Sequence, residues 1–162
     1  ITHKTESGGV HLGVRTAKQL DAALRQIDSI KSRTRKKRYL LEETAPPGLE
    51  VIVGARNDPS WGPVILLGLG GVTAEILEDV SMRLAPVGRK DALAMIDELK
   101  SAALFNGFRG APAVDKAALA DAIVAVGNMI LKTPEIREID LNPVRVYSDG
   151  DGILALDSLI LA

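Results

Sequence analysis

Apolar positions recur at helical spacing in three stretches of the chain, which predicts three amphipathic helices. The first runs from an N-cap at Thr16 to about Lys31, the second covers roughly residues 89–103, and the third covers about residues 115–131, with Asp115 as its cap. The residues predicted to be buried are Leu20, Ala23, Leu24, Ile27 and Ile30 in the first helix, Leu93, Ile96 and Leu99 in the second, and Leu119, Ile123, Val126 and Ile130 in the third.

Shorter apolar runs with Pro and Gly confined to the joints predict β-strands between the helices. The runs cover residues 10–14, 39–44, 49–56, 63–69 and 135–141. Short strands joined by tight turns favour an antiparallel arrangement. The predicted fold class is therefore α+β, with a mainly antiparallel sheet and helices packed on it.

A β-hairpin is predicted near the end of the chain, where Asp149-Gly150 separates the apolar runs 144–147 and 153–156. If this dipeptide forms a two-residue type I′ turn, counting back without a bulge sets Asn142 opposite Asp157. A turn centred on Asp151-Gly152 separates the two residues instead.

The first register brings oxygen ligands together on one face of the hairpin. Directly opposed residues have Cβ atoms about 4.5–5.5 Å apart, and strand alternation keeps Asp140 on the face of Asn142. The amide oxygen of Asn142 and the carboxylate of Asp157 could reach one Mg²⁺, which usually takes one or two protein ligands plus phosphate oxygens. The alternative is structural: Asn142 caps a turn before Pro143, and Asp157 ends an edge strand.

Composition removes several classes of function. The chain has 162 residues, with 20 basic and 21 acidic side chains, so no overall field favours nucleic acid or an anionic membrane. It contains no cysteine and only two histidines, which excludes disulfides, thiol catalysis and a His-rich metal site. No apolar run reaches the roughly 18 residues of a spanning helix, so a cytoplasmic protein is expected. Because the chain starts at Ile1 among polar residues, we expect a piece of a longer polypeptide.

Other polar segments admit two interpretations each. Residues 3–9 combine a Lys and a His with two glycines, which suits phosphate contact or a flexible surface loop. Residues 31–38 hold six basic side chains, which could contact phosphates or an acidic partner, or form a solvated connection. Glu42, Glu43 and Glu50 lie within apolar runs, as outward-facing strand residues also do.

Four segments taken together resemble a known family: residues 3–10, 42–50, 68–75 and 140–143. They are similar to the ATP-grasp domain of the nucleoside-diphosphate-forming (ADP-forming) acyl-CoA synthetases, relatives of the succinyl-CoA synthetase β subunit. The resemblance covers nearly the whole chain and implies an N-terminally truncated ATP-grasp fold. It implies a lid-like part at residues 1–35 and a nucleotide- and magnesium-binding part at residues 36–162.

The resemblance also implies roles for individual residues. Asn142 and Asp157 match the Mg²⁺ ligands, in agreement with the hairpin count. His3 matches a histidine that receives phosphate beside the nucleotide, with Asp140 or Glu75 orienting it. The residues matched to ATP or ADP are Lys4, Gly8 and Gly9 at the phosphates, Glu42 or its neighbour Glu43 and the Ala45 backbone at the adenine, and Glu50 at the ribose.

The implied function is a reversible phosphoryl relay between ATP or ADP and a phosphohistidine during acid–thiol ligation. The implied partners are CoA-binding and ligase domains of the same or a partner chain, in an oligomeric parent. We expect little ligase turnover from this chain alone. One alternative is a regulatory ATP-grasp-like module fused to a protein acetyltransferase. Another is a subunit-docking surface without nucleotide affinity.

Overall fold

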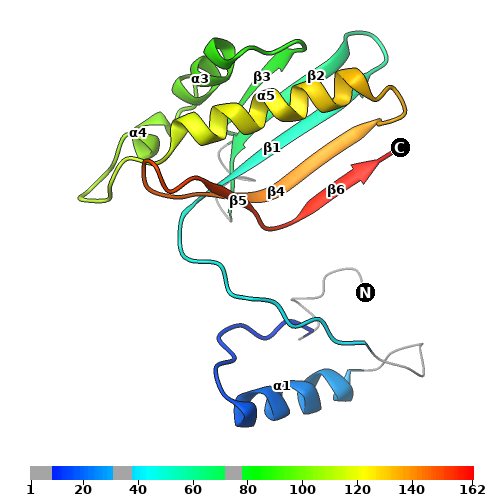
Figure 1. Cartoon of the computed structure of the whole chain (residues 1–162), viewed down its shortest axis with the longest axis vertical. Coiled ribbons are helices and arrows are strands. Elements are labelled where there is room, and N and C mark those ends of the chain that lie inside the picture. The colour runs from blue at the N-terminus through cyan, green and yellow to red at the C-terminus, as the bar shows by residue number, and fades with distance from the viewer. Residues whose placement is uncertain (1–8, 31–37, 72–77) are drawn as a thin grey trace. The chain divides into compact units, whose positions relative to one another are not determined.

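The computed structural model describes residues 9–30, 38–71 and 78–162 (Figure 1). Its contacts divide the chain into two units, Ile1–Pro46 and Pro47–Ala162, which are described separately. The predicted boundary between residues 35 and 36 falls in a stretch outside the described residues. The division into a lid-like and a nucleotide-binding part therefore stays a prediction.

The first unit contains the predicted helix, α1 (Ala17–Ser29). Thr16 caps it through a capping box, in which Gln19 N–H donates to Thr16 Oγ1 at 3.2 Å and Thr16 N–H donates to Gln19 Oε1 at 3.1 Å. The strands predicted at residues 10–14 and 39–44 are wrong, because the described residues of both runs pair with no other strand. Leu40 and Leu41 are exposed, so their apolar pattern does not mark a buried sheet face.

The second unit is built on a six-stranded antiparallel sheet. Its strands are β1 (Leu49–Asp58), β2 (Gly62–Leu69), β3 (Val80–Leu84), β4 (Glu138–Val146), β5 (Ile153–Ala155) and β6 (Ser158–Leu161). They lie in the order β3-β2-β1-β4-β5, and β6 also pairs with β4. The predicted mainly antiparallel sheet is confirmed.

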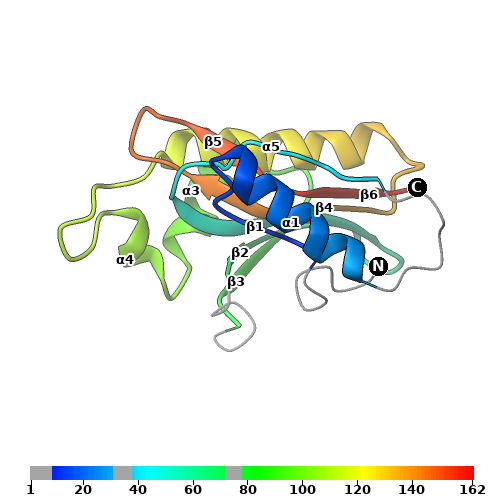
Figure 2. The ribbon, with the colours of Figure 1, turned by 90° about the horizontal axis from the view of Figure 1, so that it is seen from below.

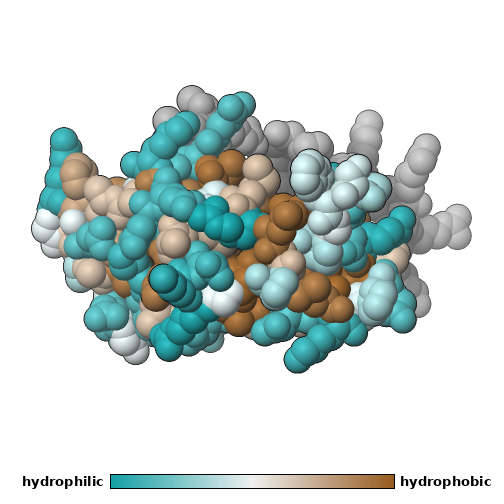
Figure 3. Space-filling model, turned by 90° about the horizontal axis from the view of Figure 1, so that it is seen from above, coloured by the Kyte–Doolittle hydropathy of each residue, from teal (hydrophilic) through white to brown (hydrophobic). Residues whose placement is uncertain are grey.

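Three helices follow β3 along the chain: α3 (Arg89–Asp97), α4 (Ala102–Phe105) and α5 (Lys116–Lys132). α5 lies along one face of the sheet (Figures 1 and 2). All four residues predicted to be buried on this helix are buried, as are Ile96 and Leu99, while Leu93 is half-buried. Elsewhere on the surface, apolar side chains lie exposed among polar ones (Figure 3).

The helix predicted over residues 89–103 ends earlier, at Asp97. Asp79, which precedes β3, accepts hydrogen bonds from Lys100 N–H at 2.7 Å and Ser101 N–H at 2.8 Å. These bonds hold the backbone just before α4 begins, so the chain turns between α3 and α4 instead of continuing as one helix.

Candidate nucleotide and magnesium site

A β-bulge in β4 shapes the sheet face opposite α5. Val51 of β1 pairs with Val144, but Val53 pairs with Leu141, so Asn142 and Pro143 together face one residue of β1. Proline has no N–H to give to the ladder and is tolerated at a bulge. Such bulges re-aim neighbouring side chains, often beside functional sites.

Asn142, in the bulge of β4, lies opposite Asp157, which is between β5 and β6. The pairs Val144–Ala155 and Leu141–Ser158 on either side set this register, and Asn142 N–H donates to the Asp157 carbonyl at 3.2 Å. Both residues are exposed. The opposition predicted from the sequence is therefore confirmed.

The turn that sets this register differs from the predicted type I′. Gly150 has φ +86°, but Asp149 is not among the positive-φ residues, so only the second central position is left-handed, as in a type II turn. Asp149 N–H donates to the Ala113 carbonyl at 3.0 Å, which ties this residue to the loop before α5. The loop still has two central residues, because Asp151 N–H donates to the Ser148 carbonyl at 2.8 Å.

Negative charge gathers beside the Asn142–Asp157 pair. Burial raises the pKa of Asp140, and the neighbouring carboxylates of Glu138 and Asp157 raise it further. One oxygen of Asp157 accepts a hydrogen bond from Ser158 N–H at 2.8 Å. Among the described residues, no group of three His, Asp or Glu side chains could enclose a metal. An amide and a carboxylate oxygen on an acidic, exposed face fit Mg²⁺, which keeps waters and takes phosphate oxygens as further ligands.

Glu50 lies on β1 directly opposite Arg145 of β4. The Nε and Nη2 atoms of Arg145 both donate to Glu50 Oε1, at 3.1 and 3.0 Å. The side chain of Glu50 is 32% exposed and that of Arg145 is 23% exposed, so water screens this ion pair less than a fully exposed pair. Sequence reasoning missed Arg145, because a count without a bulge does not set it against Glu50.

The glycine turn after β2 packs against the backbone of Glu50. Gly70 N–H donates to the Glu50 carbonyl at 2.7 Å, and a Cβ at Gly70 would lie 2.8 Å from the Glu50 carbonyl carbon. A side chain therefore cannot replace this glycine without a backbone shift. A Cβ at Gly71 would lie 3.8 Å from Glu50 Oε2. Residues 68–71, the described part of the family-like segment 68–75, thus border the Glu50 carboxylate.

The model of one protein family, described as an ATP-grasp domain, matches residues 1–161. The chain belongs to the ATP-grasp family. This confirms the predicted ATP-grasp fold. The resemblance to the ADP-forming acyl-CoA synthetases is also confirmed, because the relatives of the chain include a subunit of an ADP-forming acetate–CoA ligase.

Two curated relatives of this ATP-grasp chain differ greatly in length. It is 40% identical to the β subunit of ADP-forming acetate–CoA ligase I from Pyrococcus furiosus, over 99% of this chain and 70% of the relative. It is 45% identical to trans-feruloyl-CoA synthase FCS1 from an unknown prokaryotic organism, over 99% of this chain but 23% of the relative. The chain thus spans most of a separate β subunit and about a quarter of the longer synthetase.

Solved structures of similar ATP-grasp chains carry ligands. An acetyl-coenzyme A synthetase from Ca. Korarchaeum cryptofilum, in complex with coenzyme A and Mg-AMPPCP, matches with a TM-score of 0.84 and 41% identity, over 98% of this chain and 70% of that one. Its phosphohistidine segment points towards the nucleotide-binding site. A second structure of the same organism's enzyme, with coenzyme A, has a TM-score of 0.86 and 40% identity, over 100% and 72% of the two chains.

The remaining predicted ATP-grasp site residues belong to the first unit or lie outside the described residues. His3, Lys4, Gly8 and Glu75 lie outside the described residues. Gly9, Glu42, Glu43 and Ala45 belong to the first unit, where Glu42 and Glu43 are exposed. The structure therefore places Glu50, Asp140, Asn142 and Asp157 on one sheet and leaves the other assignments as predictions.

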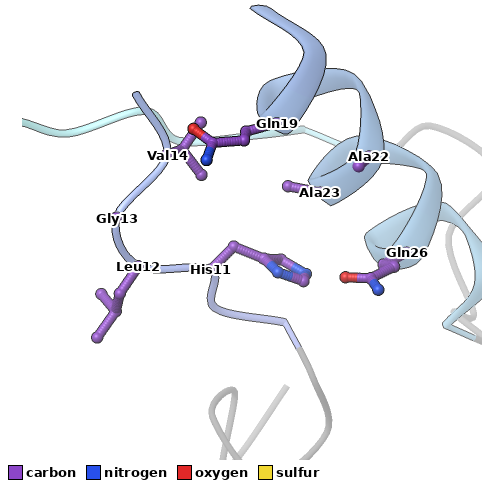
Figure 4. Close-up of a pocket in the computed structure, with 8 residues that line it drawn as sticks. All are labelled: His11, Leu12, Gly13, Val14, Gln19, Ala22, Ala23 and Gln26. Carbon is purple, nitrogen blue, oxygen red and sulfur yellow. The ribbon is translucent and has the colours of Figure 1, made fainter. Parts of the chain in front are cut away.

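The first unit also carries a hollow of about 210 Å³ between α1 and the segment before it (Figure 4). The ring of His11 points towards Gln26 there, and Gln19 lies near Val14 at the other end. None of the described residues predicted for the nucleotide site lines this hollow.

No helix in the described part of the chain is both long and apolar enough to cross a membrane.

Proposed function

We propose that this chain is the nucleotide-binding part of an ADP-forming acyl-CoA synthetase, and that it moves a phosphoryl group between ATP or ADP and a histidine. The observation that carries the proposal is the opposition of Asn142 and Asp157, bonded through their backbones at 3.2 Å on the exposed, acidic face of the sheet. The relative from Pyrococcus furiosus, a β subunit of an ADP-forming acetate–CoA ligase, supports the same reaction class.

Asn142 and Asp157 would hold Mg²⁺ through their side-chain oxygens. When bound, the ion neutralises charge on the phosphates, which lowers the barrier to phosphoryl transfer. Asp140, Glu138 and Asp157 provide the local negative charge that attracts a cation to this face.

The nucleotide would lie against the same sheet. The Glu50 carboxylate would accept hydrogen bonds from the ribose hydroxyls. The other proposed contacts are Glu42 or Glu43 and the backbone of Ala45 for the adenine, and Lys4, Gly8 and Gly9 for the phosphates. Lysine and glycine backbone groups suit the last task, because both donate to phosphate oxygens at close range.

His3 would act as the nucleophile in its neutral form. Its ring nitrogen attacks the γ-phosphorus of ATP while the bond from that phosphorus to the bridging oxygen breaks and ADP leaves. The reverse step returns the phosphoryl group to ADP. Asp140 or Glu75 would accept a hydrogen bond from the other ring nitrogen, which fixes the tautomer and stabilises the positive ring.

The remaining chemistry of ligation would lie on CoA-binding and ligase domains, in the same chain or in a partner of an oligomeric parent. We accordingly expect little ligase turnover from this chain alone and propose a cytoplasmic setting. The regulatory alternative, a module fused to an acetyltransferase, has no support among the two curated relatives named above, which are a CoA synthase and a CoA ligase subunit.

Labelling with γ-³²P-ATP tests the relay. In the parent synthetase with Mg²⁺, this domain should acquire an acid-labile, base-stable label, and His3→Ala should remove it. His11 is the other of the two histidines of the chain, so His11→Ala is the matched control and should keep the label. Label that persists on this domain in His3→Ala would refute the assigned role of His3.

A further inference from the structure

Arg145 makes the closest described contact to the carboxylate assigned to the ribose. Its Nε and Nη2 atoms both donate to a single oxygen of Glu50, Oε1, at 3.1 and 3.0 Å. The two residues are a directly opposed cross-strand pair in the centre of the sheet, on β1 and β4. Both ends of this contact are therefore held by regular strands.

The backbone of Glu50 is fixed independently of the ion pair. Glu50 pairs with Arg145 in the antiparallel pairing of β1 with β4. On the other side, Gly70 N–H donates to the Glu50 carbonyl at 2.7 Å. The freedom that remains lies in the side-chain torsions of Glu50. A guanidinium donates in a planar, rigid fork, so it restricts these torsions more than a single point charge would.

The arrangement leaves the second oxygen of Glu50 for another donor. Within the described part of the chain, no hydrogen bond reaches Oε2. Oε2 lies near Gly71, and a Cβ added to this glycine would be 3.8 Å from it. Because residue 71 is glycine, it has no side chain that could cover Oε2. An ionised carboxylate only accepts hydrogen bonds, and sugar hydroxyls are donors of the right kind.

We infer that Arg145 is a positioning residue that holds Glu50 so that Oε2 selects nucleotides with ribose hydroxyls over deoxynucleotides. The inference rests on the proposed nucleotide site and adds a specificity determinant to it. A polar site built to bind a hydroxyl rejects an analogue that lacks it, because the protein acceptor is then left unpaired. The discrimination depends on the orientation of Glu50 and therefore on Arg145.

The test compares the affinity for Mg²⁺-ATP with those for Mg²⁺-2′-deoxy-ATP and Mg²⁺-3′-deoxy-ATP by calorimetric titration. We expect the wild-type chain to favour ATP about tenfold over at least one deoxy analogue, as a hydrogen bond to a charged group implies. Arg145→Met should reduce that ratio to about one while retaining affinity for the deoxy analogue. Arg145→Lys keeps the charge without the fork and should give an intermediate ratio.

Arg56→Met is the matched control, because Arg56 lies on the same strand and sheet face as Glu50 but is exposed and pairs with Glu138. It should keep the wild-type ratio. Thermal melts monitored by circular dichroism establish that each variant is folded at the titration temperature. Arg145→Lys provides the comparison if Arg145→Met unfolds.

The outcomes separate the two proposals. If the wild-type chain discriminates and both Arg145 variants retain its full ratio, the positioning role of Arg145 is wrong while the nucleotide site stands. If the wild-type chain binds both forms of nucleotide equally, the ribose role of Glu50 is wrong and the inference falls with it. If neither nucleotide binds, the proposed function itself is contradicted. A ratio lost in Arg145→Met, reduced in Arg145→Lys and kept in Arg56→Met supports the inference.

Discussion

Replacement of Asp79 should destabilise the second unit through a specific pair of hydrogen bonds. Asp79 is 3% exposed, and its two carboxylate oxygens accept from Lys100 N–H at 2.7 Å and Ser101 N–H at 2.8 Å. Asp79→Asn keeps the shape of the side chain but turns one acceptor into a donor, which then faces an N–H group. Loss of one hydrogen bond to a charged acceptor costs about 2 kcal/mol of unfolding free energy.

The effect should depend on pH with a defined sign. Burial by itself raises the pKa of Asp79, but hydrogen bonding by Ser101 and Lys100 outweighs it, and the net pKa in the folded protein is lowered. A lowered folded pKa stabilises the protein above the pKa of the unfolded carboxyl, about 3.9. The stabilisation is lost as the pH falls from there through the folded pKa. The gap between wild type and Asp79→Asn should therefore be full near pH 7 and shrink below about pH 4.

Urea unfolding followed by far-UV circular dichroism measures this gap. The single tryptophan, Trp61, is 72% exposed at a hairpin tip, so its fluorescence reports poorly on the core. Asp121→Asn is the control, because the described contact of the Asp121 side chain is an exposed ion pair with Arg89. Loss of this ion pair should cost less than about 0.5 kcal/mol of unfolding free energy. An Asp79→Asn variant as stable as wild type at pH 7, or a gap that widens in acid, would refute the assignment.

Two further substitutions test the packing around the site. Gly70→Ala places a Cβ 2.8 Å from the Glu50 carbonyl carbon. We expect the free energy of unfolding in urea to fall by about 2 kcal/mol and nucleotide binding to weaken. Unchanged stability and affinity would disprove this close approach. Phe105→Ala removes a fully buried ring and should cost about 4 kcal/mol in the same assay, whereas a cost below about 1 kcal/mol would mean that α4 does not pack on the core.

The metal pair could be predicted from the sequence because a hairpin register depends on the number of residues in the turn. Asp149 and Gly150 are the two central residues whether the turn is type I′ or type II. The register that places Asn142 opposite Asp157 is therefore correct although the predicted turn type was wrong. The helix α5 was predictable for a similar reason, since its buried residues follow one period without interruption.

Other features depend on contacts that no local pattern records. The bulge at Asn142-Pro143 shifts β4 by one residue against β1 and sets Arg145 opposite Glu50. β3 was missed because its alternation is inverted, with Val80 and Met82 exposed and Ser81 buried against Glu98. The early end of α3 follows from hydrogen bonds to Asp79, which lies about 20 residues away in the sequence.

The most direct test of the proposed site is a calorimetric titration of the chain with ATP, with and without Mg²⁺, in wild type and Asp157→Ala. Asp157 is exposed and its main described side-chain contact is to Ser158 N–H, so the variant should fold and lose less than about 1 kcal/mol of stability. Asp151→Ala, on the exposed turn of the same hairpin, is the matched control. We predict Mg²⁺-dependent binding in wild type and Asp151→Ala and its loss in Asp157→Ala. Equal Mg²⁺-dependent affinity in all three proteins would contradict the assignment of Asn142 and Asp157 as the metal site.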